Sequence, residues 1–223
     1  MSVIHPQAIL VLPHLRIQNA NAIASPLTHG FPSITAFTGL MWALERKLAQ
    51  AGVPLRLQAV GVVCHHHQEQ ATQGYVRSFN PQKPSVRTAE QVYKLEQGTP
   101  PAIVEEGRMH LRLTLVLAVS EKPAPGAPGA LVQGNEAQLA DWAAKAGHMV
   151  AGMRVAGGSV LPSRPMPGQR VRPWLAIVPE DPQAAADAFR AWRRQWLPGF
   201  ALVGRDDLLA RRLQYLRATQ PGA

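Results

Sequence analysis

Three stretches of the sequence carry the apolar pattern of strands in the middle of a sheet. Residues 8–17 read AILVLPHLRI, residues 55–64 read LRLQAVGVVC, and residues 103–119 contain leucines at every second position. A period of two places such side chains on one face of a strand. Pro13 cannot donate a ladder hydrogen bond, so we expect the first strand to lie at an edge or to be bulged there.

Helical spacing of apolar residues follows two of these strands. After residues 18–33, which we expect to be irregular, the first predicted helix begins at Ser33 or Thr35 and ends near Ala51. The second runs from Asn135 to Val150 with one apolar face.

The C-terminal part continues with shorter elements. Residues 153–161 (MRVAGGSVL) predict a strand interrupted by a glycine pair, and residues 174–178 predict a further short strand. Basic amphipathic helices are expected over residues 184–196 and 206–218.

The order of strand, helix, strand, insert, strand, helix, strand predicts an α+β fold of the ferredoxin-like, RNA-recognition (RRM-like) type. The insert, at about residues 65–101, is polar and broken by prolines, which favours a projecting β-hairpin. We expect an RRM-like domain over residues 1–178. A C-terminal helical extension over residues 179–223 is expected to pack on the same domain.

Composition narrows the class of protein. The chain has 223 residues, of which 46% are hydrophobic, enough for one substantial core. No stretch approaches the roughly 18 apolar residues of a membrane span, and the first residues lack the pattern of a signal peptide. We therefore expect a cytoplasmic protein without membrane contact. The single cysteine, Cys64, excludes an internal disulfide framework.

The formal net charge of +9 favours a polyanionic partner, above all nucleic acid. Eighteen of the 23 basic residues are arginine, which suits bidentate phosphate contacts and stacking on bases. A GC-rich genome also produces many arginines, so the net charge is the stronger of the two arguments.

Metal or catalytic chemistry is not indicated, and no cofactor is expected. The adjacent residues His65, His66 and His67 would alternate between faces of a strand, so only His65 and His67 could share one. No acidic cluster or thiolate pair accompanies them, and no spacing matches a nucleophile with its base.

Two segments carry candidate RNA contacts. Gln18, Asn19 and Asn21 bear amides that can read base edges, although Asx-turns that shape a loop explain them equally well. Gly157 and Gly158 with Ser159 permit close approach of a phosphate backbone, and a bulge explains the glycines just as well.

The predicted hairpin adds a cation and aromatic combination. Arg77, Phe79 and Arg87 are the residue types of a stacking platform for single-stranded nucleic acid. The arginines of the two C-terminal helices are more typical of solvated helix faces.

Five phrases together resemble a known family. LRIQNANAIASPLTHGFPSITAFTGL, VGVVCH, AIVEEGRMHL, MRVAGGSVLP and LPGFALVGRDDLL occur in an order similar to the type I-F CRISPR-associated Csy-complex subunit of the "Cas five" group, within the RAMP superfamily. The resemblance spans Ile9 to about Thr219. His29 stands where the family leads us to expect tryptophan, and the family is usually longer at its C-terminal end. The chain is therefore either trimmed or a compact relative, such as the equivalent subunit of a type IV system.

The resemblance implies an RRM-like RAMP fold with a hairpin thumb, and a subunit without nuclease activity. Its implied partners are the 5′ handle of the guide RNA (crRNA), the large subunit of the effector complex and a backbone RAMP subunit, with target DNA reached through the complex. The residues that it places at the RNA come from three regions: Gln18, Asn19, Asn21, Ser25, Thr28 and His29; Arg77, Phe79 and Arg87 in the thumb; and Arg154, Gly157, Gly158 and Ser159.

Two other functions stay open from the sequence. One is a guide-RNA-processing endoribonuclease of the same superfamily, which would need His14 or His29 as general base. The other is a general RNA-binding module without a CRISPR role.

Overall fold

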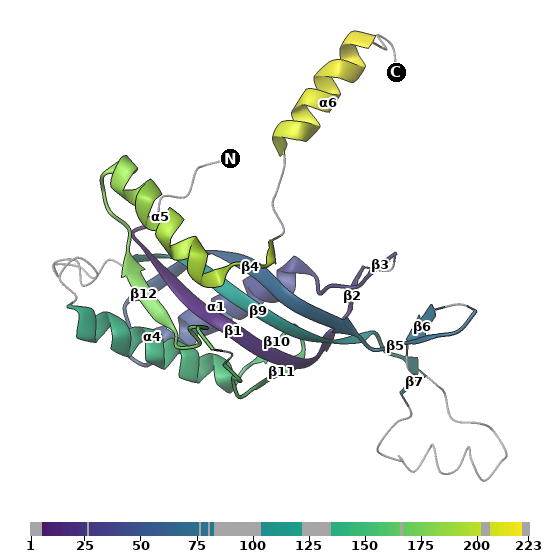
Figure 1. Cartoon of the computed structure of the whole chain (residues 1–223), viewed down its shortest axis with the longest axis horizontal. Coiled ribbons are helices and arrows are strands. Elements are labelled where there is room, and N and C mark those ends of the chain that lie inside the picture. Colours follow the sequence, from purple (N-terminus) through teal and green to yellow (C-terminus); the bar gives the residue numbers. More distant parts are fainter. Residues whose placement is uncertain are drawn as a thin grey trace.

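The computed structural model describes residues 6–25, 27–75, 77–79, 81–82, 104–121, 135–165, 167–201 and 206–219. Within these ranges the chain forms a seven-stranded sheet and four helices (Figure 1). Three long strands make the centre of the sheet, with β9 (Arg108–Glu121) between β1 (Ala8–Asn21) and β4 (Leu55–Glu69). Each strand pairs antiparallel with its neighbour.

The outer edge of β1 is shared by two short strands. β12 (Trp174–Ile177) pairs with Ala8–Val11, and β11 (Gly158–Leu161) pairs with Arg16–Gln18. Pro13 falls between the two pairings, where the register of β1 with β9 shifts and His14 adopts a φ of 50°. The predicted bulge is therefore confirmed. The alternative, that β1 is an edge strand, is wrong. Pro13 lies in the gap between β12 and β11, where no strand needs the N–H that proline lacks.

Residues 153–161 form a hairpin, not the single strand that the pattern predicted. β10 (Arg154–Val155) pairs back on β11 through a two-residue turn, in which Ala156 and Gly157 have φ values of 49° and 78°. Positive φ at both turn positions is the signature of a tight hairpin turn. Gly158 serves close packing instead, since a Cβ there would lie 2.6 Å from Ile17 Cγ2 and 2.8 Å from the backbone nitrogen of Ala20.

Helices α1 (Ile34–Gln50) and α4 (Glu136–Ala151) cover one face of the sheet, as predicted (Figure 1). The side chain of Asn135 caps α4 by accepting a hydrogen bond from the backbone N–H of Gln138. The largest fully buried side chains among the described residues are Leu10, Leu12, Ile17, Phe37, Leu44, Leu48, Leu55, Met109, Leu113, Leu115 and Leu117.

The opposite face is covered only in part. Helix α5 (Pro182–Trp196) packs there against Trp174 of β12, with the rings of Trp174 and Trp196 stacked at 6.2 Å. The chain then reaches β13 (Phe200–Ala201), which pairs with the outer edge of β4 at Val63 and Cys64. Helix α6 (Asp206–Thr219) follows. The predicted domain boundary at residue 178 stays a prediction.

The predicted insert begins later than expected. β4 continues to Glu69 within the main sheet, because the register with β9 resumes after a bulge at His65. A hairpin of β5 (Ala71–Gln73) and β6 (Arg77–Phe79) follows, and β7 (Pro81–Gln82) pairs with β8 (Val104–Glu105). The rest of the insert, which includes Arg87, lies outside the described residues.

A short hairpin also occupies part of the segment expected to be irregular, with β2 (Ile23–Ser25) paired to β3 (Thr28–His29). Across the described ranges, none of the helices has both the length and the apolar character needed to cross a bilayer.

Candidate nucleic-acid interface

The three central strands present a polar surface on the face that α1 and α4 leave open. Alternation along β9 explains it: Leu111 and Leu113 are buried in the core, so His110 and Arg112 point to the other side. The register then sets His66 beside Arg112 and Gln68 beside His110 on β4. On β1, Arg16 lies opposite Arg112.

These side chains line a surface cavity of about 590 Å³. Arg164, from the segment after β11, completes its rim. Arginines, amides and imidazoles are groups that contact phosphates, read base edges and stack on bases. The residues that line the cavity are Arg16, Ile17, Gln18, His66, Gln68, His110, Leu111, Arg112, Leu161 and Arg164.

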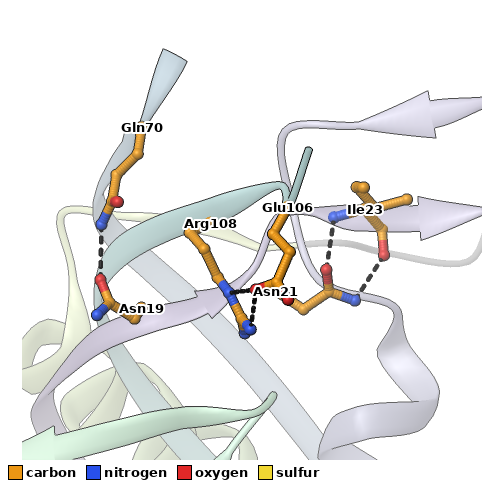
Figure 2. A network of polar contacts seen from close by, with 6 residues as sticks. All are labelled: Asn19, Asn21, Ile23, Gln70, Glu106 and Arg108. Carbon is orange, nitrogen blue, oxygen red and sulfur yellow. Dashed lines mark hydrogen bonds and ion pairs between the residues drawn. The ribbon is translucent and has the colours of Figure 1, made fainter. Parts of the chain in front are cut away.

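The three amides singled out in the sequence have different surroundings. They lie on the bulged end of β1, not in the loop that was expected. Gln18 is exposed and lines the cavity. The Asn19 side-chain oxygen accepts a hydrogen bond of 2.7 Å from the Gln70 amide (Figure 2).

Asn21 is held by its own backbone neighbourhood (Figure 2). Its side-chain oxygen accepts from the N–H of Ile23 at 3.1 Å, and its amide donates to the carbonyl of Ile23 at 2.9 Å. This local closure fits the turn-shaping interpretation of the amide. Nearby, Arg108 forms an ion pair with Glu106 (Figure 2).

Ser25, Thr28 and His29 lie on the short hairpin β2–β3. The hydroxyls of Ser25 and Thr28 are 2.7 Å apart and hydrogen-bonded to each other. His29 Nδ1 is 2.7 Å from a carboxylate oxygen of Glu69, and its ring meets the edge of Phe79 at 5.5 Å. The structure therefore brings His29 and Phe79, which are 50 residues apart, into one cluster.

The glycine-rich hairpin makes a separate hollow of about 370 Å³. Arg154 and Gly157 line it together with Asn21 and Ser33. Arg154 also donates a hydrogen bond of 2.8 Å to the Ser159 hydroxyl.

In the insert, the structure describes the backbone of Arg77, which pairs with Gln73 in the β5–β6 hairpin. Arg87 is outside the described part of the chain.

Sequence reasoning missed most of the open face, since none of the following was singled out as an RNA contact: Arg16, His66, Gln68, His110, Arg112 and Arg164. The available signal was the set of polar positions between the buried leucines of the predicted strands. Those positions must face away from the helices once the leucines face them.

Strand alternation left open that His65 and His67 share a face, and the structure arranges the three histidines of β4 differently. A bulge after Cys64 shifts the register, so that His66 pairs beside Arg112 and His67 beside the buried Leu111. His65 packs on His14 instead, with ring centroids 4.3 Å apart. Within the described residues, no group of three or more potential ligands is placed to hold a metal.

Comparison with known proteins gives this surface a context. Residues 10–223 match the family described as CRISPR-associated protein (Cas_Csy2). The chain belongs to the Csy2 family of CRISPR-associated proteins. It is 39% identical over 230 residues to the CRISPR-associated protein Csy2 of Pseudomonas aeruginosa (strain UCBPP-PA14). That alignment covers 100% of this chain and 63% of the relative.

Membership of the Csy2 family confirms the CRISPR association that the five sequence phrases suggested. The chain spans less than two thirds of the length of the curated relative that it matches.

Proposed function

We propose that this chain acts as a non-catalytic subunit of a type I-F CRISPR ribonucleoprotein complex and binds the 5′ handle of the guide RNA. In this role it helps to nucleate assembly with a large subunit and a backbone RAMP subunit, and reaches target DNA through the complex. Membership of the Csy2 family, together with a polar and basic sheet face in a protein of net charge +9, supports the proposal.

The arrangement of strands supports an RRM-like RAMP fold. Chain order is strand, helix, strand, strand, helix, strand when the insert is set aside, and β11 and β12, which follow the second helix, pair with β1. RNA-recognition domains of this kind bind single-stranded RNA on the open face of the sheet. We propose that the β5–β6 hairpin is the base of the thumb implied by the family.

The open face separates two kinds of contact. Arg16 and Arg164 carry charges suited to phosphates, which fix the position of an RNA without reading its sequence. Gln18 offers a donor and an acceptor to a base edge. We propose that Gln18 is the base-reading amide of the three, because Asn19 and Asn21 are engaged with neighbouring groups.

Salt dependence of binding tests the phosphate contacts. Fluorescence anisotropy with a labelled guide-type RNA should give a steep linear fall of log K with log salt. Arg16→Ala and Arg164→Ala should each lower the slope by about one unit per lost phosphate contact, for cognate and scrambled RNA alike. Arg46→Ala is the matched control, since Arg46 lies on α1 and stacks on Trp42 away from the sheet's open face. Binding that does not respond to salt contradicts the proposal.

The absence of nuclease activity needs its own assay. We propose that labelled repeat RNA remains intact on incubation with the purified chain. Cleavage at one position, lost on substitution of His14 or His29, would favour the endoribonuclease instead.

A further inference from the structure

A second cavity of about 470 Å³ lies on the open face, between the sheet and the C-terminal end of α5. The sheet contributes His14, His65 and Arg112 to its wall. Arg112 also lines the larger cavity described above, so the two hollows adjoin at this side chain. The other side is formed by Pro167, Gly168, Gln169 and Arg170, and by Arg194, Gln195, Leu197 and Pro198.

A directed chain of hydrogen bonds holds His14 and His65, the two histidines of the cavity wall, in place. His65 Nδ1 is 2.9 Å from the carbonyl of Pro198, which can only accept, so Nδ1 carries the hydrogen. Burial lowers the pKa of His65 and favours the neutral ring; the hydrogen bond to Pro198 opposes this shift, and the charge of Arg112 adds to it. Nε2 therefore accepts from the Thr114 hydroxyl at 2.8 Å. The Thr114 oxygen in turn accepts from the backbone N–H of His14 at 3.1 Å.

The imidazole of His14 stands out from this network. The residue is only 8% exposed, and its Nδ1 is buried without a hydrogen-bond partner among the described residues. Burial first, and then the neighbouring His65 and Arg112, lower its pKa, so the ring is neutral near pH 7. A buried polar nitrogen without a partner is costly and calls for an explanation. His14 lines the cavity, and a turn of its ring about the Cβ–Cγ bond would bring Nδ1 to the cavity, where a bound molecule can supply the partner.

The other walls indicate what that molecule is. Arg112, Arg170 and Arg194 bring three guanidinium groups to the cavity, and guanidinium pairs with phosphate in bidentate fashion. Arg170 is positioned by stacking on Trp174 at 5.3 Å and by a hydrogen bond of 3.3 Å to Gln195. The cavity volume falls within the range of about 300–1,000 Å³ typical of small-molecule sites.

We propose that this cavity binds one nucleotide unit, with its phosphate on the arginines and a base edge on His14 Nδ1. The unit comes either from a free nucleotide or from one nucleotide of an RNA that crosses the adjoining sheet face. The second source rests on the proposed function, and the first does not.

Nucleoside 5′-monophosphates test the cavity without RNA. Calorimetric titration should show that at least one of the four binds at least tenfold more tightly than its nucleoside or inorganic phosphate. His14→Phe should reduce that affinity tenfold or more, while the matched His67→Phe leaves it unchanged. Arg194→Ala should weaken binding, whereas Arg190→Ala, on the same helix but paired with Asp187, should not. A monophosphate that binds no better than inorganic phosphate overturns the proposal.

Circular dichroism would show whether His14→Phe still folds. If it does not, nuclear magnetic resonance of the wild-type chain provides the decisive measurement. With ¹⁵N-labelled histidine, the Nδ1 resonance of His14 should shift when the monophosphate is added. An unchanged resonance at saturating ligand contradicts the assignment.

RNA carrying single abasic positions distinguishes the two sources. For an RNA nucleotide, one abasic position should cost as much affinity as His14→Phe, and combining the two should cost no more. Equal RNA binding by wild type and His14→Phe, with monophosphate binding lost in the variant, identifies a free nucleotide.

Monophosphate binding without any RNA binding refutes the proposed function and leaves the proposed nucleotide site unaffected. RNA binding unaffected by His14→Phe and Arg194→Ala, with no monophosphate binding, overturns the cavity alone.

Discussion

The two faces of the central sheet are built from the same three strands and have opposite chemistry. Ile17 and Gln18 are neighbours on β1, yet Ile17 is 2% exposed beneath the helices while Gln18 is exposed beside the cavity. The helix-covered face is an apolar core, and the open face carries arginine, histidine and glutamine side chains. With RNA bound on the open face, as proposed, stability and binding would rest on alternate residues of the same strands, so substitutions on one face should leave the other property intact.

The largest expected effect comes from the covered face. Leu12→Ala, on β1 but outside the lining of the proposed RNA cavity, should lower the free energy of unfolding by about 2–5 kcal/mol, since it removes a fully buried side chain and leaves a cavity. Urea denaturation measures the change. RNA affinity of the protein that remains folded should match that of wild type, and a selective loss of RNA affinity would break the proposed separation of the faces.

A smaller loss is expected at the hairpin that packs on β1. Gly158→Ala places a Cβ against Ile17 and against backbone atoms of Gln18 and Ala20, and overpacking of this kind costs about 1–3 kcal/mol. Gly39→Ala, within α1, is a suitable control, because no atom lies within 4 Å of its would-be Cβ apart from its chain neighbours and the nearby backbone of its own helix. Equal melting temperatures for the two variants would show that the hairpin shifts enough to accommodate the added methyl group at little cost.

His14 and His65, which lie beside the end of α5 on the open face, make the free energy of unfolding depend on pH. Their pKa values are lowered on folding by burial, so the unfolded chain takes up protons at a higher pH than the folded one. Stability should therefore be fully present above about pH 6.5, and it should fall as the pH drops through 6.5 toward the lowered folded-state values. Each histidine contributes at most about 1.4 kcal/mol per pH unit.

Urea unfolding of wild type and His14→Phe at pH 7.5 and 5.5 measures this effect. The variant should lose less stability than wild type over the same interval. The neighbouring charges of His65 and Arg112 also disfavour a protonated His14, so they act in the same direction as burial. An equal loss in both proteins would assign the pH dependence to other groups.

The smallest effect on stability is expected at Gln18. Gln18→Ala changes an exposed side chain and should alter the free energy of unfolding by no more than about 0.5 kcal/mol. Cognate handle RNA should nevertheless bind more weakly by roughly 1–3 kcal/mol, with scrambled RNA little affected. If both RNAs lose affinity equally in an anisotropy titration, Gln18 contacts the backbone.

The same alternation explains what could be predicted from the sequence. The long strands were predicted from apolar residues at every second position, and the helices α1 and α4 from apolar residues at every third or fourth position. The hairpin at Ala156 was missed because a non-glycine residue takes up a positive φ there, held by pairing on both sides. The bulge at His14 was predicted because Pro13 precedes it, whereas the bulge at His65 was missed because no proline lies near it.

The candidate site was predictable only in part. Gln18 was found because amides stand out, but Arg16 and Arg112 look like ordinary solvated charges until the register sets them side by side. The second cavity could not be predicted from the sequence, because its hydrogen-bond network joins His14, Thr114 and Pro198, which lie far apart along the chain. Contacts over such separations are properties of the fold.

The pairing of β12 with the beginning of β1 has a consequence for how the chain is made. Ala8–Val11 leaves the ribosome early, yet its partner Trp174–Ile177 follows more than 160 residues later. At a synthesis rate of about 5–20 residues per second, one edge of the first strand waits for at least several seconds. An unpaired apolar edge invites association with other chains. During translation, therefore, this edge of the first strand stays open to association with other chains until residue 177 has emerged.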